Sequence, residues 1–149
     1  LFRQEMDGAP AETRIGEARV TRQGGDLTSF AYGLMLHESL AAAETLSGEG
    51  TECTVVDLLT LNPLDRETIL DSARATGKVL IVHEDTLTGG LGGEIAAIIA
   101  EHAFEYLDAP IRRVAGPDIP PIPFHHAMED FFMPNRDKIA SAARELAAY

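Results

Sequence analysis

Hydrophobic runs of strand length alternate along this chain with segments whose apolar residues recur at helical spacing. The strongest strand candidate is residues 78–82, which are apolar on both faces, as interior parallel strands are. Residues 51–59 and 111–114 are further strand candidates, and Leu36 to Leu46 and Ile139 to Leu146 carry helical stripes. This order predicts an α/β fold, a three-layer α/β/α sandwich around a mostly parallel sheet of about five strands.

Turn and capping residues give the boundaries of these elements. Gly24-Gly25 separates two short runs, residues 18–23 and 26–32, and predicts a hairpin leading into the first interior strand. Asp65 and Asn135 are suited to cap two helices, the first of which closes at Gly77. Residues 1–17 lack periodicity and are expected to be a linker or arm from a preceding domain, so that the folded domain spans residues 18–149.

The charge balance restricts the partners. In 149 residues, 12 Lys and Arg face 24 Asp and Glu, a formal net charge of −12. Nucleic-acid binding needs a basic footprint, so this class is excluded. The acidic excess lies in residues 1–110, with 7 basic and 19 acidic side chains, whereas residues 111–149 hold 5 of each. A partner that meets the first part through charge is expected to be cationic.

Cysteine content and hydropathy indicate the compartment. Cys53 is the single cysteine and lies in an apolar run, which excludes a disulfide framework and a cysteine-rich metal site. No apolar stretch reaches the roughly 20 residues of a membrane helix, and no signal segment opens the sequence. We therefore expect a cytoplasmic protein without membrane contact.

A glycine-rich loop follows the strongest strand and precedes a helix that is expected to run past Tyr106. The loop of residues 84–93 predicts a possible anion-binding cleft at the carboxyl ends of the strands. The candidate residues are Glu84, Gly90 and Gly92 in the loop and Glu94 directly after it. The loop is neither a dinucleotide fingerprint nor a P-loop. The alternative is a tight turn that lets the helix start close to the sheet.

Other polar clusters do not form a complete active site. His83 ends the central strand beside two acids, but a structural role there is favoured over a catalytic one. His125-His126 lie on a proline-rich loop and diverge, which argues against a metal site. Cys53 is expected to be inert. The residues alone therefore predict no catalytic, cofactor-binding or metal-ligating residue.

An ordered series of motifs resembles one known family. The motifs include Gly25-Asp26-Leu27-Thr28, Val56-Asp57-Leu58-Leu59-Thr60-Leu61-Asn62-Pro63, Thr76-Gly77-Lys78, Val82-His83-Glu84, Gly89-Gly90-x-Gly92-Gly93-Glu94-Ile95-Ala96 and Leu107-Asp108-Ala109-Pro110. Over about residues 15–149 the chain resembles the transketolase-type C-terminal domain of the β chain of thiamine-diphosphate-dependent 2-oxoacid dehydrogenases. The ordered set is far more specific than any single motif.

The resemblance implies an assembly and docking domain that is inactive by itself. Thiamine diphosphate and Mg²⁺ would bind in the full enzyme, between the α chain and the remaining domains of the β chain. The expected partners are those parts, in a heterotetramer, and the basic subunit-binding domain of dihydrolipoyl acyltransferase. Asp108 and Tyr149 match the family's partner-binding positions. The alternative function is an autonomous small-anion-binding or regulatory domain that uses the 84–93 loop.

The sequence does not decide the role of one apolar segment. Phe124, Phe131 and Phe132 follow Pro123 and fit either a buried subunit interface or a cover over the core.

Overall fold

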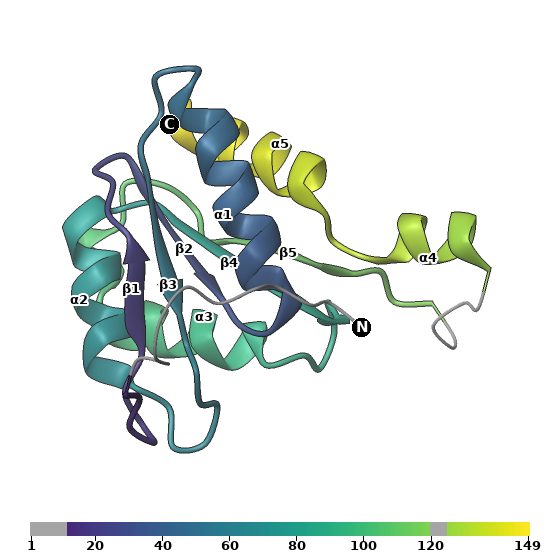
Figure 1. The fold of residues 1–149 in the computed structure, drawn as a ribbon. Coiled ribbons are helices and arrows are strands. Elements are labelled where there is room, and N and C mark those ends of the chain that lie inside the picture. Colours follow the sequence, from purple (N-terminus) through teal and green to yellow (C-terminus); the bar gives the residue numbers. More distant parts are fainter. Residues whose placement is uncertain (1–11, 120–124) are drawn as a thin grey trace.

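The computed structural model describes residues 12–119 and 125–149, with five strands and five α-helices among them (Figure 1). Residues 1–11 of the expected linker, and Phe124, lie outside the described residues. The elements are β1 (Arg19–Arg22), β2 (Leu27–Ala31), α1 (Leu34–Ser47), β3 (Cys53–Asp57), α2 (Arg66–Thr76), β4 (Val79–Thr86), α3 (Gly92–His102), the short 3₁₀-helix η1 (Phe104–Tyr106), β5 (Arg112–Gly116), α4 (His126–Phe132) and α5 (Arg136–Ala147).

The strands form one sheet in the order β1-β3-β2-β4-β5. β2 lies in the middle and pairs in parallel with β3 and with β4, β5 adds to β4 in parallel, and β1 is antiparallel to β3. The predicted five-stranded, mostly parallel sheet is therefore confirmed. Because the parallel strands share one direction, their carboxyl ends meet at one edge of the sheet, the carboxyl edge, and their starts meet at the opposite amino edge.

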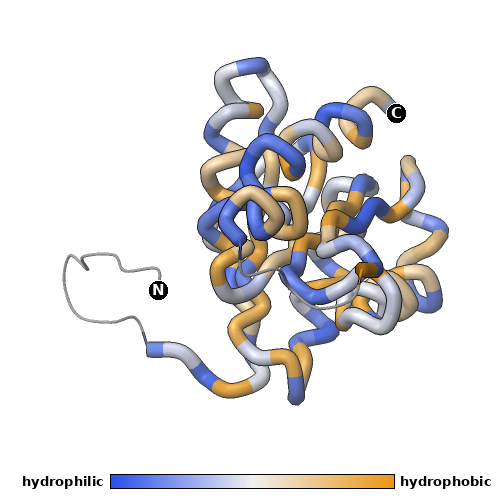
Figure 2. The backbone as a smooth tube through the Cα atoms, turned by 90° about the vertical axis from the view of Figure 1, so that its right-hand side faces the viewer, coloured by the Kyte–Doolittle hydropathy of each residue, from blue (hydrophilic) through white to orange (hydrophobic). Residues whose placement is uncertain are grey.

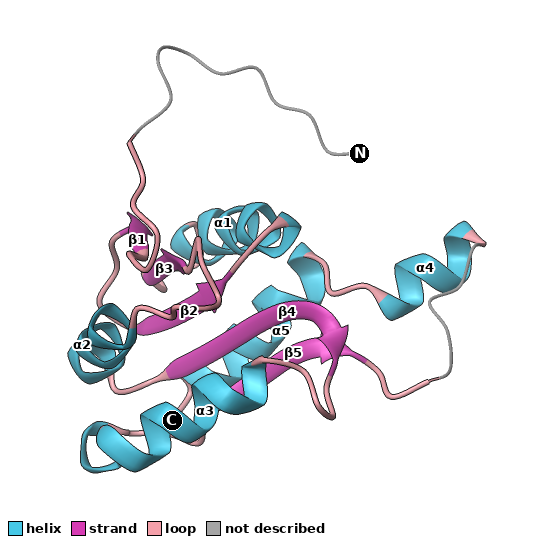
Figure 3. Ribbon diagram, turned by 90° about the horizontal axis from the view of Figure 1, so that it is seen from below, coloured by secondary structure: helices cyan, strands magenta, loops and turns pink. Residues whose placement is uncertain are grey.

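Helices cover both faces of the sheet. Seen from below, α1 and α5 lie on one face and α2 and α3 on the other (Figure 3). Alternate residues of one strand serve opposite faces, since Val55 packs with the α1 and α5 residues and Val56 with those of α2 and α3. The helices themselves carry hydrophobic and hydrophilic residues in alternation (Figure 2). The chain thus closes a core on each side of its sheet.

The predicted caps are present and tie separate segments together. The Asp65 carboxylate accepts hydrogen bonds from the backbone N–H groups of Thr68 (3.0 Å) and Ala18 (2.8 Å), which joins the start of α2 to the entry of β1. Burial raises the pKa of Asp65, but these bonds outweigh it, so that the pKa lies below its usual value. Asn135 caps α5 through the N–H of Lys138, also at 3.0 Å.

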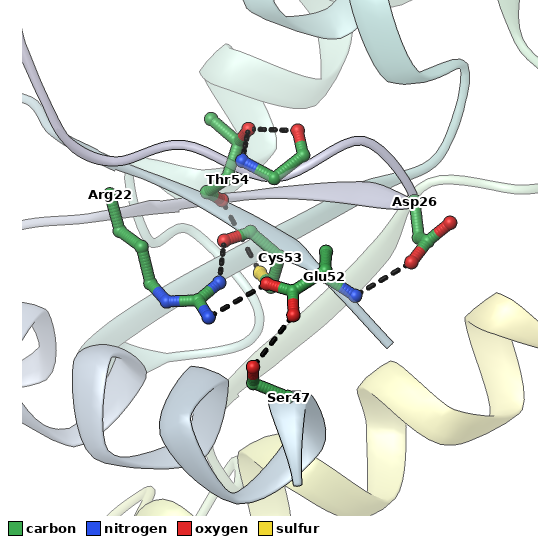
Figure 4. A network of polar contacts seen from close by, with 7 residues as sticks. Arg22, Asp26, Ser47, Glu52, Cys53 and Thr54 are labelled. Carbon is green, nitrogen blue, oxygen red and sulfur yellow. Dashed lines mark hydrogen bonds and ion pairs between the residues drawn. The ribbon is translucent and has the colours of Figure 1, made fainter. Parts of the chain in front are cut away.

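The predicted hairpin at Gly24-Gly25 is wrong. β1 and β2 do not pair, because β3 lies between them and pairs with both. The connecting segment instead crosses the start of β3, where the Thr54 hydroxyl accepts from the N–H of Gly24 (2.9 Å) and donates to its carbonyl (2.6 Å) (Figure 4). Hydrogen bonds to Thr54 in β3 therefore hold this segment, and no hairpin turn forms. The sequence pattern around Gly24-Gly25 is the same for both arrangements and does not distinguish them.

A polar network fixes this crossing to α1. The Glu52 carboxylate accepts from the Arg22 guanidinium (2.8 Å) and from the Ser47 hydroxyl (2.6 Å), and its backbone N–H donates to Asp26 (2.6 Å) (Figure 4). Arg22 also donates to the carbonyl of Cys53. The end of β1, the start of β2, the end of α1 and the start of β3 are therefore held together at the amino edge.

Two segments differ from the sequence prediction. The helix expected to run past Tyr106 ends at His102, whose carbonyl accepts a hydrogen bond from Arg74 (3.0 Å), and the chain continues as η1. The segment after Pro123 contains the helix α4 where a loop was expected. Lys138 stabilises its carboxyl end by donating to the carbonyls of Asp130, Phe131 and Met133 at 2.6–3.0 Å.

Candidate functional site

The glycine-rich loop at the carboxyl edge encloses a histidine ring. β4 continues beyond its predicted end to Thr86, with His83 fully buried and Glu84 and Asp85 exposed. Both ring nitrogens of His83 lack a hydrogen-bond partner. A Cβ on Gly92 would overlap the ring, and a Cβ on Gly90 would lie 2.6 Å from its Cε1 atom. The glycines therefore leave space that the imidazole fills.

The electrostatics of this loop do not favour an anion. Burial lowers the pKa of His83, and Arg113 lowers it further while Asp85 raises it, so that the ring is neutral at pH 7. Glu84 and Glu94 are exposed around the loop and would repel a negative ligand. The predicted cleft residues thus lie together, but their geometry supports the tight turn. The Tyr32 ring lies parallel to the His83 ring, with the two centroids 6.5 Å apart.

Neither a reactive thiol nor a metal-ligating cluster is present in the part of the chain that the structure describes. Burial raises the pKa of the Cys53 thiol to about 12, which leaves it protonated and inert. Among the described residues, no group of three or more His, Cys, Asp or Glu could hold a metal ion. His126 contacts Glu129 alone, at 3.8 Å, on the exposed face of α4.

A cavity at the amino edge brings together the two residues that the resemblance marked for partner binding. It has a volume of about 550 Å³ and is called here the amino-edge cavity. Asp108 follows η1, whereas Tyr149 follows α5, and both side chains line this space and are exposed. The cavity is lined by Ala100, Phe104, Leu107, Asp108, Ala109, Pro110, Ile111 and Tyr149. It presents one carboxylate among apolar and aromatic walls.

The aromatic walls are unusually exposed for their size. Phe104 is 74% and Tyr149 64% exposed. Large aromatic side chains bury 150–250 Å² each when they are covered, so an exposed pair beside a cavity is typical of a binding surface. Phe104 and Ile111 were not identified from the sequence. The available signal was the aromatic pair Phe104 and Tyr106 just before the Leu107-Asp108-Ala109-Pro110 motif.

The position of Asp108 is set by the end of α2. Its backbone N–H donates to the Gly77 carbonyl (2.8 Å), and its carboxylate lies where a Cβ of residue 77 would be. Arg74 neutralises the nearby carboxyl end of α3 through the His102 carbonyl, and its guanidinium lies 5.5 Å from the centre of the Tyr106 ring. No cation among the described residues pairs with the Asp108 carboxylate. Its charge is available to a partner.

Together the doubly wound sheet and the amino-edge cavity define an α/β domain with an exposed apolar cavity that holds one carboxylate. The chain belongs to the transketolase C-terminal domain family, whose sequence model matches residues 16–139. This confirms the resemblance drawn from the ordered motifs.

The relatives of this chain are longer proteins. The chain is 53% identical over 149 residues to the 2-oxoisovalerate dehydrogenase subunit beta of Bacillus subtilis, covering all of this chain and 46% of the relative. It is 38% identical over 148 residues to the pyruvate dehydrogenase E1 component subunit beta of the same organism, covering 99% and 45%. A split gene transketolase, described as an inactive beta4 tetramer, has a TM-score of 0.80 at 29% identity, covering 93% and 44%. The chain thus spans about half the length of these relatives.

Proposed function

We propose that this chain is the C-terminal domain of the β subunit of a thiamine-diphosphate-dependent 2-oxoacid dehydrogenase. The complete enzyme would decarboxylate a 2-oxoacid oxidatively and transfer the acyl group to a lipoyl acyltransferase. The domain itself would join the remaining β-chain domains and the α chain in a heterotetramer and dock the acyltransferase. Support comes from the relatives named above, which this chain covers over about half of their length.

Thiamine diphosphate and Mg²⁺ would be held outside this chain. The cofactor supplies the carbanion-stabilising chemistry of such enzymes. Its diphosphate needs N–H donors and a metal, but the glycine-rich loop of residues 84–93 is filled by His83 and flanked by Glu84 and Glu94. The described residues do not fit this cofactor, and none of them is assigned a step of the reaction. For the same reason the alternative function, an anion-binding domain, has weaker support.

The observation that carries the proposed docking role is the shared position of Asp108 and Tyr149 in the amino-edge cavity. The acyltransferase's subunit-binding domain is small and basic, as the family resemblance implies. An uncompensated carboxylate within an acidic chain steers such a partner and orients it, while the exposed Phe104 and Tyr149 supply apolar contact area. We expect salt-sensitive binding through this surface.

The compartment is part of the proposal. Among the described residues, none of the helices has both the length and the hydropathy of a membrane-spanning segment. The single cysteine, Cys53, is buried and free. We propose that the complete enzyme is cytoplasmic, as expected for a chain without a disulfide framework.

Titration of the complete enzyme with the purified acyltransferase subunit-binding domain tests the docking role. Asp108→Arg is expected to weaken binding by about tenfold or more, because it places a cation against a basic partner. Tyr149→Ala is expected to weaken binding through lost apolar contact. Glu105→Arg makes the same charge change at an exposed residue that does not line the cavity, and is the matched control. If Asp108→Arg and Glu105→Arg behave alike, the cavity is not the docking site.

A further inference from the structure

The end of α2 and the turn into β4 contact three segments that line the amino-edge cavity. Arg74 lies in the last turn of α2, Gly77 ends the helix, and Lys78 directly precedes β4. Gly77 contacts Asp108, as described above. Neither Arg74 nor Lys78 lines the cavity, yet each donates a hydrogen bond to a segment that carries one of its aromatic walls. The two cations therefore contact the supports of the cavity and not its interior.

Lys78 holds the last turn of α5, which leads to Tyr149. The half-buried Lys78 donates from its ammonium group to the carbonyl of Ala147 at 2.9 Å. The last four carbonyls of an α-helix have no partner within the helix, and a cation beside them is stabilising. Ala147 is the final residue of α5, so this bond fixes the helix end two residues before Tyr149. The place of the Tyr149 wall therefore depends on Lys78.

The rest of α5 is held independently of Lys78. Leu146 is buried in the core, and the Arg144 guanidinium donates to the Glu49 carboxylate at 2.7 and 2.8 Å. Loss of the Lys78 bond is therefore expected to free the last residues of the helix without unfolding it.

Arg74 holds the turn that carries the Phe104 wall. Its guanidinium donates to the His102 carbonyl at 3.0 Å and lies 5.5 Å from the centre of the Tyr106 ring. These two contacts lie before η1 and at its end, with Phe104 between them. Because Phe104 is 74% exposed, its own packing holds it only weakly. The orientation of η1, and with it the second aromatic wall, therefore depends on Arg74.

We infer that Lys78 and Arg74 are positioning residues of the docking surface, which order the Tyr149 and Phe104 walls before a partner binds. The inference rests on the proposed docking function. Side chains that are already ordered in the free protein lose less conformational entropy on binding, so the same contacts give a higher affinity. The affinity for the acyltransferase domain should then depend on two residues that do not line the cavity.

Loss of either cation has opposite effects under a positioning role and under electrostatic steering alone. The chain carries a net charge of −12, and removal of one cation makes it more attractive to a basic partner. Steering alone therefore predicts unchanged or tighter docking in Lys78→Met and in Arg74→Met. A positioning role predicts docking weakened by about threefold to tenfold, which is the cost of ordering one side chain on binding.

Titration of the complete enzyme with the purified acyltransferase subunit-binding domain measures both variants. Arg66→Met is the matched control for Arg74→Met, since Arg66 lies on the same helix but contacts the His102 ring, at 2.8 Å, and not its carbonyl. Arg112→Met is the control for Lys78→Met, since Arg112 contacts the exposed side of α5. Neither control should weaken docking. Unchanged docking in Lys78→Met or in Arg74→Met, or a loss equal to that of the control, overturns the inference for that residue.

Double-mutant cycles show whether each cation acts through its wall. Lys78→Met should have no further effect when Tyr149 is already changed to Ala, and Arg74→Met none when Phe104 is changed to Ala. Lys78→Arg keeps a donor for the Ala147 carbonyl and should retain most of the affinity. Additive losses in both cycles would indicate a general loss of structure and would overturn the inference.

Backbone ¹⁵N relaxation of the isolated chain tests positioning without the partner. The chain closes a core on each side of its sheet, so it can be measured as it stands. The heteronuclear Overhauser effect of the Ala147 and Ala148 amides should fall in Lys78→Met and stay unchanged in Arg112→Met. Equal values overturn the positioning role of Lys78, whatever the titration gives. A fall in Lys78→Met, together with a wild-type enzyme that does not bind the acyltransferase domain, would overturn the docking function alone.

Discussion

Asp108 donates a backbone hydrogen bond to the Gly77 carbonyl (2.8 Å), and its carboxylate occupies the space beside the Gly77 Cα. The residue that closes α2 therefore positions the acid of the amino-edge cavity. This relationship links the motif Thr76-Gly77-Lys78 to the motif Leu107-Asp108-Ala109-Pro110, which are separate in the sequence. The end of α2 and the position of the Asp108 carboxylate therefore depend on one glycine.

Gly77→Ala is expected to lower both stability and docking. A side chain at a φ of 67° costs about 1–3 kcal/mol, and its Cβ would displace the Asp108 carboxylate. Urea unfolding measures the first effect and titration with the acyltransferase domain the second. Gly50→Ala is the control, since Gly50 has a φ of 88° and nothing within 4 Å of a Cβ. Gly50→Ala should lower the free energy of unfolding without weakening docking. An equal loss of docking in both variants would contradict the role of Gly77.

Gly92→Ala is expected to destabilise the domain by about 1–3 kcal/mol, because the new Cβ would overlap the His83 ring in a filled space. Gly93→Ala, one residue further along the same helix, would place its Cβ at an ordinary 3.5 Å from Arg113 and should be tolerated. Thermal unfolding of the two variants makes the comparison. Equal melting temperatures would show that the loop does not enclose the ring.

The stability of the domain should depend on pH through His83. Burial lowers its pKa in the folded chain, so the unfolded chain takes up a proton first as the pH falls below about 6.5. The stabilisation is present above that pH and is lost as the pH falls towards the folded pKa. His83→Leu removes the titrating group and should flatten the loss of unfolding free energy between pH 7 and pH 5. His102→Gln, at an exposed position, should keep the wild-type slope, and an identical slope in His83→Leu would count against this assignment.

Asp65→Ala should cost about 1–2 kcal/mol, because it removes the cap of α2 and the bond to the Ala18 N–H. The pKa of Asp65 is lowered in the folded chain, so its contribution is present above the unfolded value near 4 and is lost as the pH falls through the folded value. Asn135→Ala removes a cap with one backbone bond and should cost less. Urea unfolding at pH 7 and pH 3 measures both. A smaller loss for Asp65→Ala than for Asn135→Ala at pH 7 would refute this ranking.

Local signals explain which parts of the fold could be predicted. Asp65 and Asn135 act on N–H groups three residues away, so the sequence alone indicates the helix starts. The strand at residues 78–82 is apolar on both faces and could be placed in the interior for the same reason. The hairpin at Gly24-Gly25 could not be rejected, because the bonds that prevent it come from Thr54 in another strand. Helix α4 was missed because its cap, Lys138, belongs to the next helix.

Only part of the candidate site could be predicted from the sequence. Asp108 and Tyr149 came from the family resemblance, and their meeting in one cavity depends on α5 running back to the amino edge. The anion cleft at Gly90 and Gly92 remains less favoured, because a sequence shows that glycines leave space but not which side chain fills it. Both the shared cavity of Asp108 and Tyr149 and the filling of the glycine-rich loop by His83 depend on tertiary packing, which the sequence does not show.

The common direction of the four parallel strands places the amino-edge cavity and the loop around His83 at opposite edges of the sheet. The heterotetramer proposed above would contain two copies of this chain and therefore two amino-edge cavities. Such a unit is bivalent towards a multisubunit acyltransferase core, so two weak contacts on neighbouring arms would act as one strong attachment. It could also bridge neighbouring cores, and the ratio of dehydrogenase to core would then govern whether particles stay separate or link into larger assemblies.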